Sequence, residues 1–145
     1  MTDGILLVHA AATWAMVGII WMVHLVQYPG FELVRGDAFP AFHRHHSTRI
    51  SWVVGPLMTV EGLSALALVA WRPAGLAPWA PLLGLALLAV CLGTTLFVSV
   101  PLHERLARGF DEAAAHRLLT TNVVRAFAWT ARGALALAFL AAYAG

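Results

Sequence analysis

The sequence of 145 residues has no lysine, a single cysteine and few charged side chains. Its one thiol, Cys91, lies within an apolar run, so neither a disulfide framework nor a CxxC site can form. Only 11% of the residues are charged and 61% are hydrophobic, whereas ordinary soluble domains are roughly 25% charged. The composition therefore excludes an ordinary soluble domain and indicates an integral membrane protein.

Four long apolar runs predict the fold. A membrane-spanning helix needs about 20 consecutive apolar residues, and a chain of this length has room for about four of them in one domain, 1–145. We therefore expect an all-α fold, an integral membrane four-helix bundle. The expected spans are residues 5–28, 50–71, 82–102 and 122–143. Residues 38–49 are expected to form a helical, interfacial lead-in to the second span.

The positions of the arginines predict the topology. The loops after the first and third expected spans are rich in arginine, whereas the loop between the second and third holds only Arg72. The arginines at the rich ends are Arg35, Arg44, Arg49, Arg105, Arg108 and Arg117. By the positive-inside rule these loops face the cytoplasm and both termini lie on the outer side. This topology brings six of the seven histidines to one membrane face: His24, His43, His45, His46, His103 and His116.

The segment His-Arg-His-His at residues 43–46 is the strongest candidate for metal chemistry. His43 and His46 are three residues apart and can point from one helix face toward the same ion. With His24 from the first span and His103 from the third, they predict a site for iron or copper, or for zinc. The alternative is that interfacial histidines form hydrogen bonds with lipid headgroups or loop carbonyls.

Two ionised side chains lie deep in the expected spans. An ionised side chain near the bilayer centre costs about 2.5 to 3.5 kcal/mol on insertion scales, so Glu61 and Arg132 should not face lipid. At 1.5 Å per helical residue, Glu61 lies roughly 18 Å and Arg132 roughly 15 Å from the cytoplasmic ends of their spans. We therefore predict a direct contact between them. Glu61, Arg132 and the neighbouring Arg125 are the candidate catalytic residues.

The fourth span carries a polar stripe. Asn122, Arg125, Trp129 and Arg132 fall within about 80° of one another on a helix, so they should line the bundle interior or a cavity. Such a stripe fits an anionic or carbonyl-bearing ligand, with arginine as its partner and with Asn122 and Trp129 as substrate-binding residues. The alternative is a structural network of ion pairs.

The first half of the chain resembles a known family. The run HAAATWAMVGIIW from His9 to Trp21, the following Tyr28-Pro29, and the segment 49–68 with its Gly-Pro-Leu-Met core at 55–58 carry the resemblance. They are similar to the first two helices of the HemJ-type membrane protoporphyrinogen oxidases and the wider CopD-like superfamily. The resemblance implies a four-helix membrane fold and a haem held partly by a first-helix histidine.

Within this resemblance only His9 matches the haem ligand, and Arg49 and Pro56 match second-helix positions. The oxidases also use a lysine, which this lysine-free chain does not supply. The second half, with Pro-Leu-His at 101–103 and Thr-Asn-Val-Val-Arg at 121–125, resembles small uncharacterised bacterial membrane proteins.

Three functional hypotheses follow. The leading one is a bacterial inner-membrane protein that binds a metal or haem through histidines and acts as a redox enzyme on a lipophilic substrate. The second is a non-catalytic binding or transport protein whose intramembrane Glu and Arg side chains form a proton or ion path. The third is a structural subunit of a homo-oligomer, built on small-residue helix contacts. Nucleic acid is not an expected partner, because the arginines lie in membrane loops and within the spans.

Overall fold

The structure is a computed structural model in which residues 2–34 and 36–144 are described. Over these residues it consists of helices joined by short turns, without a strand, which confirms the predicted all-α class. The first helical run comprises α1 (Thr2–Met22), the π-helical η1 (Val23–Gln27), α2 (Tyr28–Gly30) and η2 (Phe31–Leu33). The remaining elements are η3 (Gly36–Ala38), α3 (Phe39–Ala70), α4 (Trp79–Thr94), the π-helical η4 (Thr95–Ser99), α5 (Val100–Leu106) and α6 (Glu112–Ala144).

Four helical runs are long and apolar enough to cross a membrane: Gly4–Leu33, Gly36–Ala70, Trp79–Leu106 and Glu112–Ala144. Their number and order are as predicted, and the expected lead-in at 38–49 is helical as part of α3. The helices extend beyond the predicted spans, since α3 begins at Phe39 and α6 at Glu112. The prediction used the extent of the apolar runs, which marks the expected hydrocarbon boundary. The helices continue beyond that boundary in segments that carry both polar and apolar residues.

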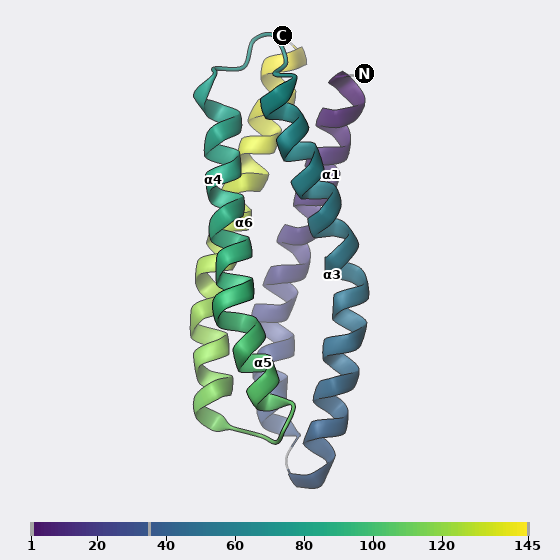
Figure 1. The fold of residues 1–145 in the computed structure, drawn as a ribbon, viewed down its shortest axis with the longest axis vertical. Helices are drawn as coiled ribbons and strands as arrows, with labels where there is room; N and C mark the ends of the chain where they lie inside the picture. Colours follow the sequence, from purple (N-terminus) through teal and green to yellow (C-terminus); the bar gives the residue numbers. More distant parts are fainter. Residues whose placement is uncertain (1, 35, 145) are drawn as a thin grey trace.

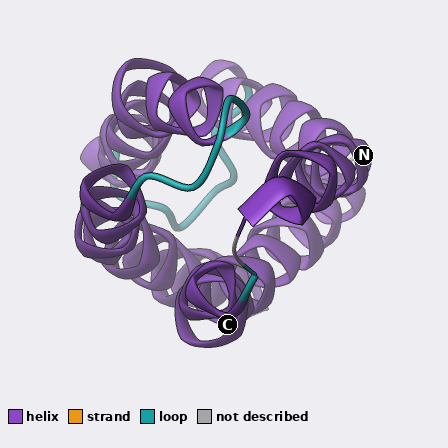
Figure 2. Ribbon diagram, turned by 90° about the horizontal axis from the view of Figure 1, so that it is seen from below, coloured by secondary structure: helices purple, strands orange, loops and turns teal. Residues whose placement is uncertain are grey.

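The four runs form an elongated bundle (Figure 1). Around the bundle α1 packs against α3 and α6, and α4 packs against α6 and α3, as the end-on view also shows (Figure 2). The start of α1 and the end of α6 lie at the same end of the bundle (Figure 1). The turns that follow the first and third runs lie at the opposite end, which we call the histidine end. Arg35, which supported the topology prediction, lies outside the described residues.

The two helical runs that lead toward the histidine end share a local backbone motif. In each, a five-residue π-helical segment is followed at the second position by a proline, Pro29 or Pro101. The backbone N–H of Tyr28 bonds to the carbonyl of Val23, and that of Val100 to the carbonyl of Thr95. A proline lacks an N–H and collides with the carbonyl four residues earlier, so a locally wider turn relieves the collision.

The two helical hairpins also share a sequence pattern. In both, Leu-x-Arg-Gly is followed after six residues by His-Arg. The two copies run from Leu33 to Arg44 and from Leu106 to Arg117, so His43 corresponds to His116. His43 is buried but His116 is exposed. The pair therefore offers a matched comparison of a buried and an exposed histidine at one end of the bundle.

Asp111 lies directly before the last helix and caps it. Its Oδ1 accepts a hydrogen bond from the backbone N–H of Ala114 at 2.9 Å, and Arg105 donates from Nε to Oδ2 at 2.7 Å. The bond from Ala114 and the nearby guanidinium lower the pKa of the Asp111 carboxyl below its usual value. Asp111 thus remains ionised and caps α6 at its positive dipole end.

Gly75, in the turn between α3 and α4, supports a stability prediction. It has φ of +88°, and a Cβ there would lie 2.9 Å from the backbone oxygen of Ala142. Gly75→Ala should therefore destabilise the protein by about 1–3 kcal/mol, which is measured as a lower melting temperature in detergent. The control is Gly93→Ala in α4, where a Cβ meets nothing within 4 Å. Equal melting temperatures for the two variants would contradict the prediction.

Candidate functional site

The predicted contact between Glu61 and Arg132 is confirmed. Nε of Arg132 donates to Oε1 of Glu61 at 2.8 Å, and the two side chains are 1% and 0% exposed. Trp129 donates from its indole nitrogen to the other carboxylate oxygen at 2.9 Å. Nη1 of Arg132 donates to the carbonyl of Gly84 in α4. The ion pair thereby joins α3, α6 and α4, and its charges cancel.

Arg125, two helical turns away on the same stripe, has a different environment. It is buried and donates hydrogen bonds to the hydroxyls of Tyr28 at 3.0 Å and Thr95 at 3.2 Å, and to the side-chain oxygen of Asn122. All three acceptors are neutral. Its Nε has no hydrogen-bond partner in the described part of the chain.

The charge of Arg125 is therefore not balanced in the way that the charge of Arg132 is. Between described side chains the ion pairs are Glu61–Arg132 and Arg105–Asp111, and Arg125 takes part in neither. Burial of an ionised group without an opposite charge is unfavourable by several kcal/mol. The four residues of the predicted polar stripe are buried as expected. Arg132 and Trp129 contact the Glu61 carboxylate, whereas Arg125 and Asn122 form a group with no opposite charge among the described side chains.

Three of the histidines predicted to bind metal meet at the histidine end. Nε2 of His43 lies 3.0 Å from Nδ1 of His103, and Nε2 of His103 lies 3.3 Å from the hydroxyl of Tyr28. The ring of His46 is centred 6.5 Å from that of His43 and 6.2 Å from that of His103. The buried ring of Phe31 packs edge-on against all three imidazoles.

The fourth predicted ligand, His24, is not part of this group. Its ring packs edge-on against Trp21 with centroids 5.8 Å apart. Across residues 2–34 and 36–144, no three His, Cys, Asp or Glu side chains are arranged to hold one metal ion. In the observed arrangement His43 and His103 form a hydrogen bond with each other, and the metal hypothesis stays a prediction.

An inner cavity of about 140 Å³ lies between the helices beside Arg125. Its apolar wall comes mainly from α1 and α3 and includes Met16, Ile19, Ile20, Val54 and Met58. Its polar wall includes Tyr28, His46, Ser51, Thr95, Ser99, His103 and Arg125. The indole of Trp129 also lines it. The cavity is thus amphipathic, with a cation on one side and hydrocarbon on the other.

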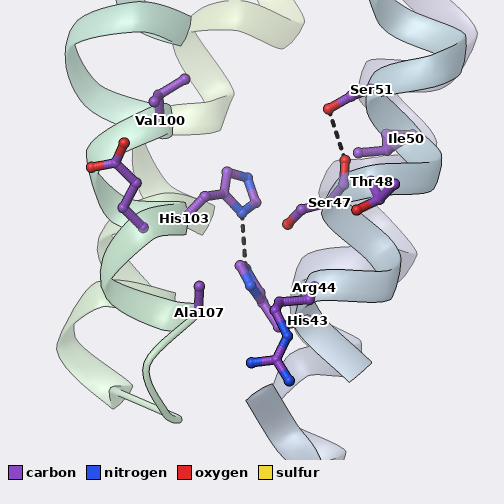
Figure 3. A pocket seen from close by; sticks show the side chains of 10 residues that line it. His43, Arg44, Ser47, Thr48, Ile50, Ser51, Val100, His103 and Ala107 are labelled. Atoms are coloured by element: carbon purple, nitrogen blue, oxygen red, sulfur yellow. Dashed lines mark hydrogen bonds between the residues drawn. The ribbon is translucent and has the colours of Figure 1, made fainter. Parts of the chain in front are cut away.

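An outer pocket of about 350 Å³ lies between α3 and α5 at the histidine end. Figure 3 shows His103 on α5 facing His43 on α3 across this pocket, with Ser47 and Ser51 on the α3 side. The outer pocket and the inner cavity share four lining residues: Ile50, Ser51, Val100 and His103. They are therefore adjacent, and the side of the bundle between α3 and α5 leads toward Arg125.

His9, the residue matched to a haem ligand, lies elsewhere in the interior. It is 4% exposed, and its Nδ1 lies 2.9 Å from Oγ of Ser64, which donates to the carbonyl of Glu61 at 3.1 Å. His9 lines neither the inner cavity nor the outer pocket. Its contacts join α1 to α3, and its role as a haem ligand stays a prediction.

Sequence reasoning assigned no role in the site to three residues that build it. Tyr28 connects Arg125 to His103, Thr95 accepts from Arg125, and Phe31 packs against the imidazoles. A signal for Tyr28 was present, since it is one of two tyrosines and stands beside Pro29 at the end of an apolar run. Thr95 and Phe31 carry no comparable signal, because an isolated threonine or phenylalanine is ordinary in such a run.

Comparison of the chain with family models, with curated proteins and with solved structures found no match. The resemblance of the first half to the oxidase family therefore stays a prediction.

Proposed function

We propose that the protein is a multi-pass membrane protein that binds a lipophilic anion, whose charged head lies in the inner cavity against Arg125. The observation that carries this proposal is the unpaired guanidinium. Arg125 is buried, lines the cavity, donates to neutral oxygens and has an Nε without a partner in the described part of the chain, whereas the neighbouring Arg132 forms an ion pair with Glu61. A bound carboxylate, phosphate or sulfonate would supply the missing opposite charge.

The chemistry of arginine supports this choice of ligand. A guanidinium presents donors in a planar fork that matches an anionic group with two oxygens. An ionised arginine deep in a membrane costs about 2.5–3.5 kcal/mol on insertion scales, and such residues face cavities or partners rather than lipid. The apolar wall of the inner cavity, with Met16, Ile20 and Met58, would contact the hydrocarbon part of the ligand.

We further propose that the bundle lies in a bacterial inner membrane with the histidine end toward the cytoplasm. This orientation places the arginine-rich turns on the cytoplasmic side and the ends of α1 and α6 outside. Among the three hypotheses from the sequence, the non-catalytic binding or transport protein is the one that a specific contact pattern supports. Redox chemistry at a metal or haem remains a hypothesis without such a pattern.

The test is a binding measurement on the purified protein in mild detergent. Tritiated palmitate should bind saturably, hexadecanesulfonate should compete with it, and uncharged hexadecanol should not. A hydrogen bond to a charged group contributes about 1.5–3 kcal/mol, so Arg125→Gln should weaken palmitate binding by roughly 10-fold or more. Arg117→Gln, which removes an exposed arginine of the same helix, should bind as the wild type does.

Arg125→Lys separates charge from geometry. It keeps a cation but loses the planar fork, so its affinity should lie between those of the wild type and Arg125→Gln. Melting temperatures of the variants identify any loss of folding. Equal palmitate affinity in wild type and a folded Arg125→Gln, or equal competition by hexadecanol, would overturn the proposal.

A further inference from the structure

We infer that the ligand of the inner cavity is a lipophilic carboxylic acid, and that its proton leaves to the outer pocket through the side chains of Tyr28, His103 and His43. This inference rests on the proposed anion site and names the class of ligand that it takes. We call these three residues the polar chain. They come from three separate elements, α2, α5 and α3.

The directions of the hydrogen bonds follow from Arg125. A guanidinium can only donate, so the oxygen of Tyr28 accepts from its Nη2 at 3.0 Å. The phenolic proton of Tyr28 is then directed to Nε2 of His103, 3.3 Å away. A neutral imidazole carries one proton, so His103 holds it on Nδ1 and donates it to Nε2 of His43 at 3.0 Å. His43 accordingly carries its own proton on Nδ1.

The two ends of the polar chain lie at the two cavities. Tyr28 lines the inner cavity and contacts Arg125, so a carboxyl group beside the guanidinium lies close to the phenol. His43 lines the outer pocket, and its Nδ1 is a buried atom that has no hydrogen-bond partner in the described part of the chain. His103 lines both. The chain therefore joins a site in the bundle interior to a pocket at its polar end.

The proton transfer can be written with all atoms accounted for. The O–H bond of the ligand breaks and its proton moves to the oxygen of Tyr28, whose own proton moves to Nε2 of His103. The Nδ1 proton of His103 moves to Nε2 of His43, and the Nδ1 proton of His43 leaves into the outer pocket when the imidazole turns to expose this buried atom. The result is one carboxylate beside Arg125 and one released proton, without any change of oxidation state. Release of the neutral acid reverses the same steps.

The charges around the polar chain favour transfer of a proton along the chain and oppose its retention on the imidazoles. Arg125 on α6 lies one hydrogen-bonded residue away from His103, and its positive charge disfavours a second proton on that ring. His46 and Arg44 on α3 and Glu104 on α5 line the adjoining cavities. Glu104, which is exposed, provides an acceptor for the released proton.

A carboxylic acid is the ligand class that fits both parts of the site. Its neutral form dissolves in hydrocarbon at little electrostatic cost, whereas its anion needs a buried cation. A sulfonate or a phosphodiester is ionised throughout the ordinary pH range and would have no proton to give to Tyr28. The polar chain can transfer a proton from the ligand only if the head of the ligand loses a proton on binding.

The experiment compares two probes in stopped-flow with a pH-indicator dye. The wild-type protein in weakly buffered detergent should release about one proton for each palmitic acid bound, at a pH at which the micellar acid is protonated. Hexadecanesulfonate should bind without proton release. His43→Gln, which does not line the inner cavity, should still bind hexadecanesulfonate within about 3-fold of wild type but release the palmitic acid proton at least 10-fold more slowly. Tyr28→Phe should also release that proton at least 10-fold more slowly, and melting temperatures show that both variants are folded.

His116→Gln is the matched control, because His116 corresponds to His43 in the repeated pattern but is exposed. It should release the proton at the wild-type rate. In His43→Gly, added imidazole should restore part of the rate, since the outer pocket adjoins the vacated position.

The outcomes distinguish this inference from the proposed function. If hexadecanesulfonate binds in an Arg125-dependent way but Tyr28→Phe and His43→Gln release the proton as fast as wild type, the relay is wrong and the anion site stands. If neither probe binds, both are wrong. A stoichiometric metal ion in the wild type that is absent from His43→Gln would also overturn the relay and support the metal hypothesis.

Discussion

Glu61→Gln should lower the melting temperature of the protein in detergent by about 10 °C. The substitution keeps the size of the side chain and an acceptor oxygen, so neither a cavity nor a clash arises. It leaves Arg132, which is 1% exposed, without an opposite charge. Breaking one partner of a buried ion pair costs about 3–5 kcal/mol, and each kcal/mol corresponds to roughly 2–4 °C in a protein of this size.

Two further variants show whether the ion pair is the cause. Glu104→Gln removes an exposed carboxylate and should change the melting temperature by no more than about 1–2 °C. The double variant Glu61→Gln/Arg132→Gln removes both charges and should recover part of the stability lost in Glu61→Gln. A Glu61→Gln protein as stable as wild type, or a double variant with strictly additive losses, would contradict the role given to the pair.

Phe31→Ala should have an effect of similar size at the other end of the molecule. Phe31 is 0% exposed, and the core cluster around it includes Val23, Phe39, Leu106 and Leu118. Removing a buried phenylalanine ring costs about 3–5 kcal/mol. We expect a melting temperature about 10 °C below that of wild type, together with slower proton release, because the ring packs against His43, His46 and His103.

The comparison for this prediction is Phe97→Ala. Phe97 lies in η4 and is 81% exposed in the isolated chain, so it has little packing to lose. Phe31→Leu, which keeps most of the buried volume, should restore much of the stability. If Phe31→Ala and Phe97→Ala melt at the same temperature, the ring is not a core residue of the histidine end.

The number of helices and the central ion pair could be predicted because both follow from the cost of placing polar groups in hydrocarbon. Apolar runs of sufficient length predict helices. A carboxylate and a guanidinium at similar depth on different helices have few other ways to avoid that cost, so the contact of Glu61 with Arg132 followed from simple depth counting. The burial of Asn122 and Trp129 followed from the same helical face.

The arrangement at the histidine end could not be predicted, because regular helical spacing fails there. His24, Gln27 and Tyr28 share one face of an α-helix, but η1 (Val23–Gln27) is π-helical and shifts that register. His24 packs against Trp21, whereas Tyr28 reaches Arg125 and His103. The metal hypothesis paired His43 with His46 by helical spacing but added His24 and His103 by membrane face alone, and membrane face does not specify which side chains meet.

The two arginines of α6 have a consequence for how the chain enters the membrane. Its span is the least apolar of the four, Arg132 near its centre adds about 2.5–3.5 kcal/mol to the cost of insertion, and Arg125 nearer its start adds a smaller cost. Glu61, which neutralises Arg132, and Tyr28, which accepts a hydrogen bond from Arg125, belong to segments synthesised earlier. Stable insertion of α6 therefore depends on its contacts with the preceding helices. Without those helices, α6 would be a poor membrane anchor.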